Sequence, residues 1–181
     1  QDKYTEIKYT PPKNDLVIKN SKNTRKKNNK NCKCAVIFFH KNLKKLYKAR
    51  WIKKCVETVL QQSYQDFDIL EVNYGNDSYS IMEDYEFGNK HYFYQKNYST
   101  HTEAMVFLLN LGFCKFNYDV IFNTNLDDYY TLDRFEKQIE CLNDGFVLCS
   151  SLMNYITEDE EKDEDYETMK WTSETYSMPC E

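Results

Sequence analysis

Long apolar runs are absent from this chain of 181 residues, although 41% of the residues are hydrophobic and 16% are aromatic. No stretch approaches the roughly 20 apolar residues that a membrane-spanning helix needs, so the sequence predicts no membrane span. Residues 1–12 are polar and lack the apolar stretch of a signal peptide. Because the chain does not begin with Met, we expect it to be a processed or excised piece of a longer polypeptide. The length is sufficient for one domain with a core rich in Tyr and Phe.

Paired cysteine motifs are also lacking. Only Cys32 and Cys34 are close in sequence, and their C-x-C has no second pair of ligands to complete a zinc site. An odd set of seven scattered cysteines is typical of a protein with reduced thiols. We therefore expect a cytoplasmic location.

The net charge is −5, but the charges are unevenly distributed. Residues 19–33 carry seven Lys or Arg side chains among asparagines, and residues 158–167 are nearly all acidic. Such blocks are usually solvated linkers or loops. The alternative for the basic block is a nucleic-acid tether, but it lacks interleaved aromatic residues and a binding motif, so we expect no nucleic-acid partner.

Composition and patterning together predict three regions. Residues 1–34 are expected to be a basic arm or linker, and residues 158–181 an acidic loop or tail. Between them, residues 35–157 alternate between two patterns. Short apolar runs predict strands, and apolar residues at helical spacing predict helices. The expected strands cover 35–39, 68–72, 91–94, 119–122 and 146–149, and the expected helices cover 51–62, 102–114 and 132–142, with a weaker one over 81–87.

Alternating strands and helices predict an α/β fold with a mostly parallel central sheet flanked by helices. No G-x-G-x-x-G or G-K-[ST] motif follows the first strand, which argues against dinucleotide or P-loop binding. In such sheets ligands bind beyond the carboxyl ends of the strands. The residues after Phe39, Val72 and Phe122 are therefore the places to look for a site.

The stretch after Phe122 contains two adjacent carboxylates, Asp127 and Asp128. At the end of a strand they could hold a hard divalent cation through oxygen ligands. Such a cation could bridge a diphosphate and stabilise it as a leaving group. The alternative is that the two residues only cap the following helix.

Two stretches of the sequence resemble family-2 glycosyltransferases. Residues 51–72 are similar to the family's first helix and second strand, including its L-x-Q-[ST]-Y motif. Residues 109–139 are similar to its L-N-x-G, D-x-D-D and R-F-E-x-Q blocks, in the same order. The resemblance covers about residues 35–157 and implies a GT-A fold, which is a single Rossmann-like α/β domain. It also implies transfer of a sugar from a nucleoside diphosphate to an acceptor hydroxyl, with inversion.

The resemblance implies roles for the residues at the strand ends. Phe39, His40 and Asn42 would lie beside the nucleotide base and ribose. Asn73 and Tyr74 stand where the family has paired aspartates before a glycine, here Gly75. Base recognition would therefore lose a carboxylate, retain amide contacts and gain ring stacking.

The D-x-D position reads Asn125-Leu126-Asp127, with Asp128 adjoining it. The resemblance implies a Mn²⁺ or Mg²⁺ cofactor there, with Asp127 and Asp128 as ligands. Asn125 lowers the negative charge, although amide oxygens also coordinate these ions. The general base is expected downstream of Glu181.

The implied partners are a nucleotide-sugar donor and a glycan, lipid or protein acceptor. The departures from the family pattern leave an alternative open. In that alternative the domain is degenerate and binds a nucleotide sugar or a protein partner without catalysis.

Overall fold

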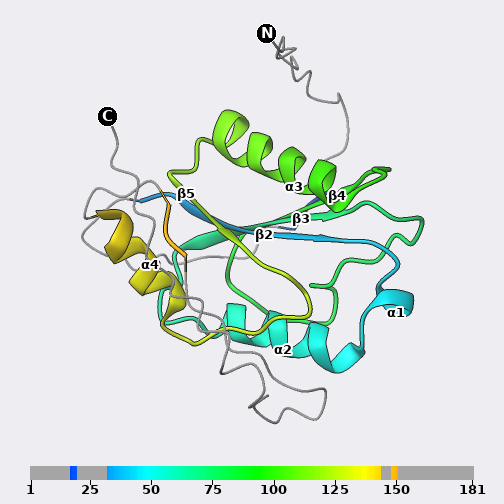
Figure 1. Ribbon diagram of the computed structural model, residues 1–181, viewed down its shortest axis with the longest axis horizontal. Coiled ribbons are helices and arrows are strands. Elements are labelled where there is room, and N and C mark those ends of the chain that lie inside the picture. The colour runs from blue at the N-terminus through cyan, green and yellow to red at the C-terminus, as the bar shows by residue number, and fades with distance from the viewer. Residues whose placement is uncertain (1–16, 20–31, 144–147, 151–181) are drawn as a thin grey trace, which may run out of the picture.

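The computed structural model describes residues 17–19, 32–143 and 148–150, and these form a five-stranded sheet with helices on both faces (Figure 1). The strand order is β1-β4-β3-β2-β5, and every neighbouring pair is parallel except β1 with β4. The expected mostly parallel sheet is thereby confirmed. The strands are β1 (Val17–Lys19), β2 (Cys34–His40), β3 (Phe67–Asn73), β4 (His91–Gln95) and β5 (Val120–Asn123).

The central strands are β2 and β3, and nearly all of their residues are buried. The strand over 35–39 was expected from a continuous apolar run, which is typical of parallel strands covered on two faces, and a strand was also expected over 68–72. Their register pairs Phe39 with Val72 and His40 with Asn73, so both strands end at the same edge of the sheet. The loops that follow them are consequently neighbours.

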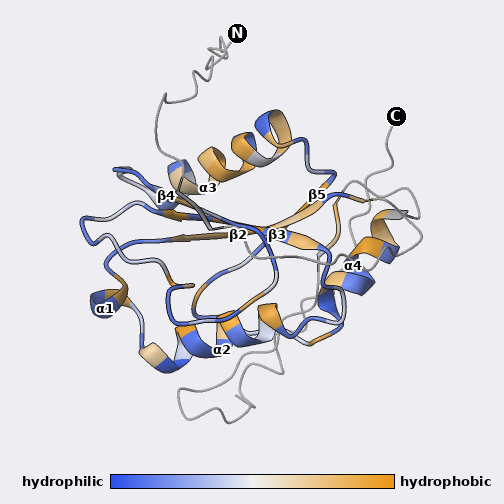
Figure 2. Ribbon diagram, turned by 180° about the vertical axis from the view of Figure 1, so that it is seen from behind, coloured by the Kyte–Doolittle hydropathy of each residue, from blue (hydrophilic) through white to orange (hydrophobic). Residues whose placement is uncertain are grey.

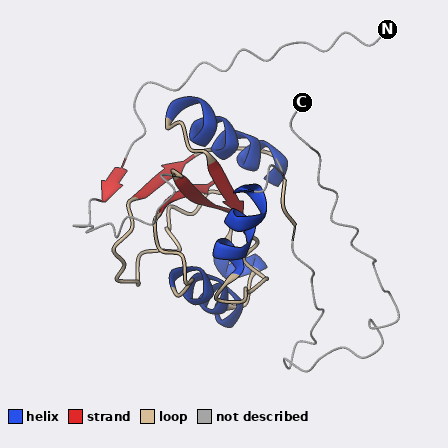
Figure 3. Cartoon of the chain, turned by 90° about the vertical axis from the view of Figure 1, so that its left-hand side faces the viewer, coloured by secondary structure: helices blue, strands red, loops and turns tan. Residues whose placement is uncertain are grey.

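Helices cover the two faces of the sheet unequally (Figures 1 and 3). One face carries α1 (Leu43–Leu46), α2 (Ala49–Leu60) and α4 (Arg134–Asn143), and the other carries α3 (His101–Asn110). A π-helical turn, η1 (Leu111–Lys115), extends α3 toward β5. Each face of the sheet therefore has its own hydrophobic cluster, one with α2 and α4 and one with α3.

The sequence pattern explains where two of these helices lie. In α2 the buried residues are Cys55, Val56 and Val59, and Figure 2 shows its apolar residues turned toward the sheet. The start of α3 is fixed by a capping box: the Thr100 side chain accepts the backbone N–H of Glu103, whose carboxylate accepts that of Thr100. Thr100 is thus the N-cap of α3.

The weaker helix expected over 81–87 is wrong. The chain makes only a turn over 81–84, held by i→i+3 bonds such as Tyr85 N to Met82 O. The two buried residues, Ile81 and Met82, are adjacent, so they do not repeat at the helical spacing that would give an apolar face.

Three further expectations concern residues that lie wholly or partly outside the described ones. Half of the strand expected over 146–149 lies outside them, and residues 148–150 form no strand. Most of the arm over 1–34 and the acidic segment 158–181 also lie outside. Within the arm, β1 was not expected, because three residues are too few to show a period.

Among the described residues, no helix combines the length and apolar character needed to cross a membrane.

Candidate functional site

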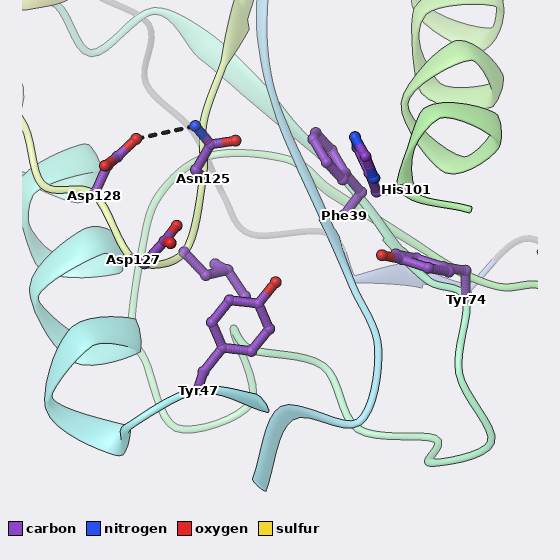
Figure 4. A pocket seen from close by; sticks show the side chains of 8 residues that line it. Phe39, Tyr47, Tyr74, His101, Asn125, Asp127 and Asp128 are labelled. Atoms are coloured by element: carbon purple, nitrogen blue, oxygen red, sulfur yellow. Dashed lines mark hydrogen bonds between the residues drawn. The ribbon is translucent and has the colours of Figure 1, made fainter. Parts of the chain in front are cut away.

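The chain order of the strands creates a crevice at the carboxyl edge of the sheet. From β2 the chain passes over one face to β3, and from β4 it passes over the other face to β5, which pairs with β2 on its free side. At such a reversal point the following loops diverge and leave space for a ligand. A pocket of about 300 Å³ lies there (Figure 4), lined by Phe39, Tyr47, Tyr74, His101, Asn125, Leu126, Asp127 and Asp128.

One end of the pocket is aromatic. Phe39 is the last but one residue of β2, Tyr74 follows β3, and His101 begins α3, so three separate elements bring these rings together (Figure 4). Tyr74 is only 6% exposed and also packs in the cluster under α3. Burial raises the pKa of its hydroxyl, which keeps it a neutral hydrogen-bonding group.

The opposite end is the loop after β5, which contains the carboxylates. Thr124 fastens it to the sheet by donating its hydroxyl to Ile37 O at 2.7 Å, and Leu126 is buried beneath it. Tyr130 accepts the backbone N–H of Asn125 at 2.9 Å, and the Arg134 guanidinium lies 4.2 Å from the centre of the Tyr130 ring. The loop is therefore held from both sides.

Asp127 and Asp128 extend from this fixed loop, Asp127 exposed and Asp128 half-buried. The Asn125 amide nitrogen donates to Asp128 Oδ2 at 2.9 Å (Figure 4), which leaves the amide oxygen available as a ligand. Within the described part of the chain, no group of three or more His, Cys, Asp or Glu side chains is placed to hold a metal ion. Any cation here would need oxygen ligands from a bound molecule or water to complete its shell.

Tyr47 stands between the two ends. It follows α1, and Figure 4 shows its hydroxyl directed into the pocket. Burial raises the pKa of Tyr47, and its neighbours Tyr74 and Asp127 raise it further. The hydroxyl is therefore protonated at neutral pH and can donate a hydrogen bond to an anionic ligand.

A buried cluster of His40, Glu71 and His91 joins three adjacent strands, β2, β3 and β4. Each histidine Nε2 is 2.7 Å from a different Glu71 oxygen, and exposure is 1% or less for all three residues. The Glu71 carboxylate also accepts from the Ser80 hydroxyl at 2.7 Å and the Ile81 N–H at 2.8 Å. Burial alone would raise the pKa of Glu71, but the bonds from His40 and His91 outweigh it and lower that pKa to about 2.

A second set of residues builds the frame of the pocket without lining it. The Asn73 amide donates to Tyr79 O and to the carbonyl oxygen of Asp77, and its oxygen accepts from Gly75 N. Asp77 in turn accepts from the backbone of Asn42, which has a left-handed conformation with φ of 50°. A Cβ on Gly75 would lie 3.0 Å from Asn42 N, so the close approach of these two loops requires glycine.

The nine site residues expected from the sequence thus separate into two groups. Those that line the pocket are Phe39, Tyr74, Asn125, Asp127 and Asp128, and those that do not are His40, Asn42, Asn73 and Gly75. The expectation for His40 is corrected, because it was expected beside the ligand and is instead fully buried against Glu71. Its partner lies 31 residues away, which no local pattern reveals.

The sequence analysis missed Tyr47 and His101. Tyr47 lies in a basic stretch without a motif. His101 had a usable signal: a helix that follows a parallel strand begins at that strand's carboxyl edge, so the first residue of α3 belongs to the same edge as the other site residues.

The fold and the pocket define an α/β protein with its ligand site at the carboxyl edge of a mostly parallel sheet. A sequence model of glycosyl transferase family 2 matches residues 34–179. The chain therefore belongs to glycosyl transferase family 2, and its GT-A type fold agrees with the resemblance found in the motifs. A search among curated proteins found no match.

The motif residues that carried the resemblance have structural roles around the loop after β5. Gln62 donates to Thr131 O at 2.8 Å and accepts from Phe135 N at 3.0 Å, which ties the end of α2 to the start of α4. The Phe135 ring stacks on Phe122 at 3.9 Å. Arg134 donates to Asn123 O at 2.8 Å. These contacts hold the carboxylate loop in place from behind.

Proposed function

We propose that the pocket binds a nucleoside diphosphate sugar and that the protein transfers the sugar to an acceptor hydroxyl, with inversion and with assistance from Mn²⁺ or Mg²⁺. The observation that carries this proposal is a single pocket that joins an aromatic end to a pair of carboxylates. A nucleotide base fits the first end, and a metal-bound diphosphate fits the second. Membership of the glycosyltransferase family supports the same reading.

The base would be held mainly by stacking. Phe39, Tyr74 and His101 offer ring faces, and stacking of a base on an aromatic side chain contributes about 1–3 kcal/mol. Asn73, which stands where the family has a carboxylate, already uses its amide to hold the loop through Asp77 and Tyr79. Amide recognition of the base by Asn73 would therefore require that loop to rearrange.

The carboxylate end fits a divalent cation that is shared with the ligand. Asp127 and Asp128 supply hard oxygen ligands, and the free amide oxygen of Asn125 can supply a third. A cation bound there would neutralise the charge that develops on the departing diphosphate. The Tyr47 hydroxyl is placed to donate a hydrogen bond to the same phosphate oxygens.

The residues that line the pocket do not supply a general base for the acceptor hydroxyl. Their carboxylates are Asp127 and Asp128, and both are assigned to the cation. We therefore propose that the general base belongs to a segment outside this pocket, in keeping with the expectation that it lies downstream. The acceptor hydroxyl would come from a glycan, a lipid or a protein.

A second candidate is a degenerate domain that binds the nucleotide sugar without transferring it. Asn125 favours this candidate, since an amide replaces a carboxylate at the D-x-D position and weakens attraction for the cation. The two candidates share donor binding and differ in turnover. Release of the nucleoside diphosphate in the presence of acceptors separates them.

The test is calorimetric titration of the full chain with UDP, GDP, CDP and ADP, each with and without Mn²⁺. We expect at least one of them to bind, and Mn²⁺ to tighten that binding about tenfold or more, since metal and diphosphate complete one coordination shell. Asp127→Asn should remove most of the Mn²⁺ effect. Asp84→Asn is the matched control, because Asp84 is an exposed carboxylate outside the pocket.

Two results would reject the donor site. One is the absence of binding by every nucleotide while the chain remains folded by circular dichroism. The other is an equal Mn²⁺ effect in wild type and Asp127→Asn, which would place the cation elsewhere.

A further inference from the structure

The helix that precedes Tyr47, α1, is too short to be stable by itself. It has four residues, Leu43–Leu46, and isolated helices of fewer than about 12 residues are at best marginal in water. Within the described part of the chain, the side chain of its N-cap residue, Asn42, makes no capping hydrogen bond. The first turn also carries no acidic residue. The position of α1 must therefore depend on contacts with other parts of the fold.

One such contact comes from Asp77, in the loop after β3. Its Oδ1 accepts the backbone N–H of Asn42 at 3.1 Å, and its Oδ2 accepts that of Leu43 at 3.2 Å. The N–H groups at the start of a helix have no partner within the helix. Asp77 thus caps α1 from a loop that lies 34 residues further along the chain.

The Asp77 carboxylate is itself held in place. The Asn73 amide nitrogen donates to the carbonyl oxygen of Asp77 and, at 3.3 Å, to its Oδ1. Burial alone would raise the pKa of this carboxyl, but the bonds it accepts from Asn42, Asn73 and Leu43 outweigh burial and lower that pKa. The side chain is therefore ionised at neutral pH, and both of its oxygens can accept hydrogen bonds.

Two further contacts join the loop after β3 to the segment that contains α1. The Lys44 ammonium lies 4.9 Å from the centre of the Tyr79 ring. Just before α1, the Lys41 ammonium lies 5.2 Å from the centre of the Tyr74 ring. The loop over 74–79 and α1 therefore form one unit beside the pocket.

This unit carries two of the residues that line the pocket. Tyr74 belongs to the aromatic end, and Tyr47 stands between that end and the carboxylates. The Tyr47 backbone N–H donates to Leu43 O at 3.0 Å, so the place of Tyr47 depends on α1. Figure 4 shows the two tyrosine hydroxyls turned toward each other across the pocket.

We propose that Asp77 is a positioning residue for Tyr47: by capping α1, it directs the Tyr47 hydroxyl to the diphosphate of the donor. This inference rests on the proposed donor site. It adds that the loop beside the base also places the group that meets the diphosphate, although Asp77 does not line the pocket. The consequence is a selectivity for nucleoside diphosphates over nucleosides that depends on Asp77.

The test is calorimetric titration of Asp77→Asn with UDP, GDP, CDP and ADP and with the four matching nucleosides, all with Mn²⁺ present. The amide keeps one acceptor oxygen and replaces the other with a donor, so one N–H at the start of α1 loses its partner. We expect diphosphate binding to weaken about three- to tenfold, which is part of what a hydrogen bond to a charged group contributes. Nucleoside binding should change by less than about twofold, because the Tyr74 N–H has its own bond to His40 O at 2.8 Å.

Tyr47→Phe supplies the second arm of the test. Removing the hydroxyl should reproduce the selective loss of diphosphate binding. Adding Asp77→Asn to Tyr47→Phe should then weaken it by less than about twofold more, because substitutions that act through one contact are not additive. Asp84→Asn is the matched control and should bind as the wild type does, since Asp84 is an exposed carboxylate outside the pocket.

Amide hydrogen exchange adds a measurement that needs no ligand. In Asp77→Asn, the amides of α1 and Tyr47 should exchange faster than in Asp84→Asn, whereas those of α2 should not, because only the first group depends on the cap. Thermal melting checks that every variant folds.

The outcomes distinguish this inference from the donor site on which it rests. If the wild-type chain binds none of the nucleotides, the donor site is rejected and the role of Asp77 is rejected with it. If the wild type binds, unchanged diphosphate affinity in Asp77→Asn overturns the positioning role alone. So does an equal loss for nucleosides and diphosphates, which would indicate general loosening. A full further loss in the Tyr47→Phe background would show that Asp77 acts by another route.

Discussion

Two sets of carboxylate side chains, Glu71 inside the sheet and Asp127 with Asp128 at the pocket, differ in how completely their hydrogen bonds are satisfied. Glu71 is fully buried and accepts bonds from His40, His91, Ser80 and the backbone of Ile81. Asp127 and Asp128 face the pocket, and the Asn125 amide donates to one oxygen of Asp128. The first carboxylate has no room for a ligand, whereas the second pair has oxygens to offer. A carboxylate whose hydrogen bonds are all satisfied within the protein therefore stabilises the fold, whereas one with unsatisfied oxygens can bind a ligand.

The difference has an energetic counterpart. A buried charge must be compensated within the protein, so loss of one partner leaves the others unpaired in a medium that cannot solvate them. A carboxylate at a pocket surface is solvated by water and can exchange that water for a cation. Substitutions in the two groups should therefore affect different measurements, and this contrast can be tested directly.

The largest expected effect is on stability, in Glu71→Ala. We expect the free energy of unfolding to fall by about 3–5 kcal/mol, because His40, His91 and Ser80 all lose their buried partner. Urea denaturation followed by circular dichroism measures it. The matched variant is Asp127→Ala, which should change stability by less than about 0.5 kcal/mol because the side chain is exposed. Equal stability losses in the two variants would contradict the contrast.

The next effect is a pH dependence that belongs to Glu71. Its pKa is about 2 in the folded protein and ordinarily 4.5, so the folded state favours the charged form. The contribution to stability is complete above pH 4.5 and is lost as the pH falls from about 4.5 toward 2. The loss amounts to about 3.5 kcal/mol at most, since one pKa unit corresponds to about 1.4 kcal/mol.

Glu71→Gln provides the control for that pH dependence. The amide does not titrate, so its unfolding free energy should vary less with pH over the same range, although it is lower at neutral pH. Parallel curves for wild type and Glu71→Gln would show that other acids cause the acid sensitivity. Asp77, whose pKa is also lowered by its hydrogen bonds despite some burial, would then be the next residue to substitute.

The buried group shows what sequence alone could not predict. Strand β2 was expected from a continuous apolar run, whereas the apolar residues of β3 are interrupted by Asp68 and Glu71. A charged residue inside such a strand signals a buried partner without identifying it. The partners of Glu71 lie 31 and 20 residues away, on strands whose pairing only the fold determines. His40 was consequently assigned to the ligand rather than to the interior.

The pocket was more accessible to sequence reasoning, for a geometric reason. In a parallel sheet all strands end at one edge, so Phe39, Tyr74 and Asp127 were expected together although they are far apart in the chain. Tyr47 and His101 were missed because they belong to helices and their connections. Which helix residue reaches the edge depends on tertiary packing, which the hydrophobic pattern does not specify.

The smallest expected effect is that of Asn125→Asp, a substitution within the loop that carries Asp127 and Asp128. The substitution restores a third carboxylate beside Asp127 and Asp128, and an added charge near a solvated divalent ion contributes about 1–2 kcal/mol. Mn²⁺ should therefore bind about five- to thirtyfold more tightly in calorimetry with a nucleoside diphosphate present. The same change replaces the bond from Asn125 to Asp128, 2.9 Å long, with repulsion between two carboxylates. Without metal, Asn125→Asp should thus be about 0.5–1.5 kcal/mol less stable than wild type, and Mn²⁺ should restore the difference. An isosteric Asp128→Asn variant should instead bind Mn²⁺ more weakly and change stability little. If Asn125→Asp leaves Mn²⁺ affinity unchanged while lowering stability, Asn125 only braces the loop, and the cation site does not include position 125.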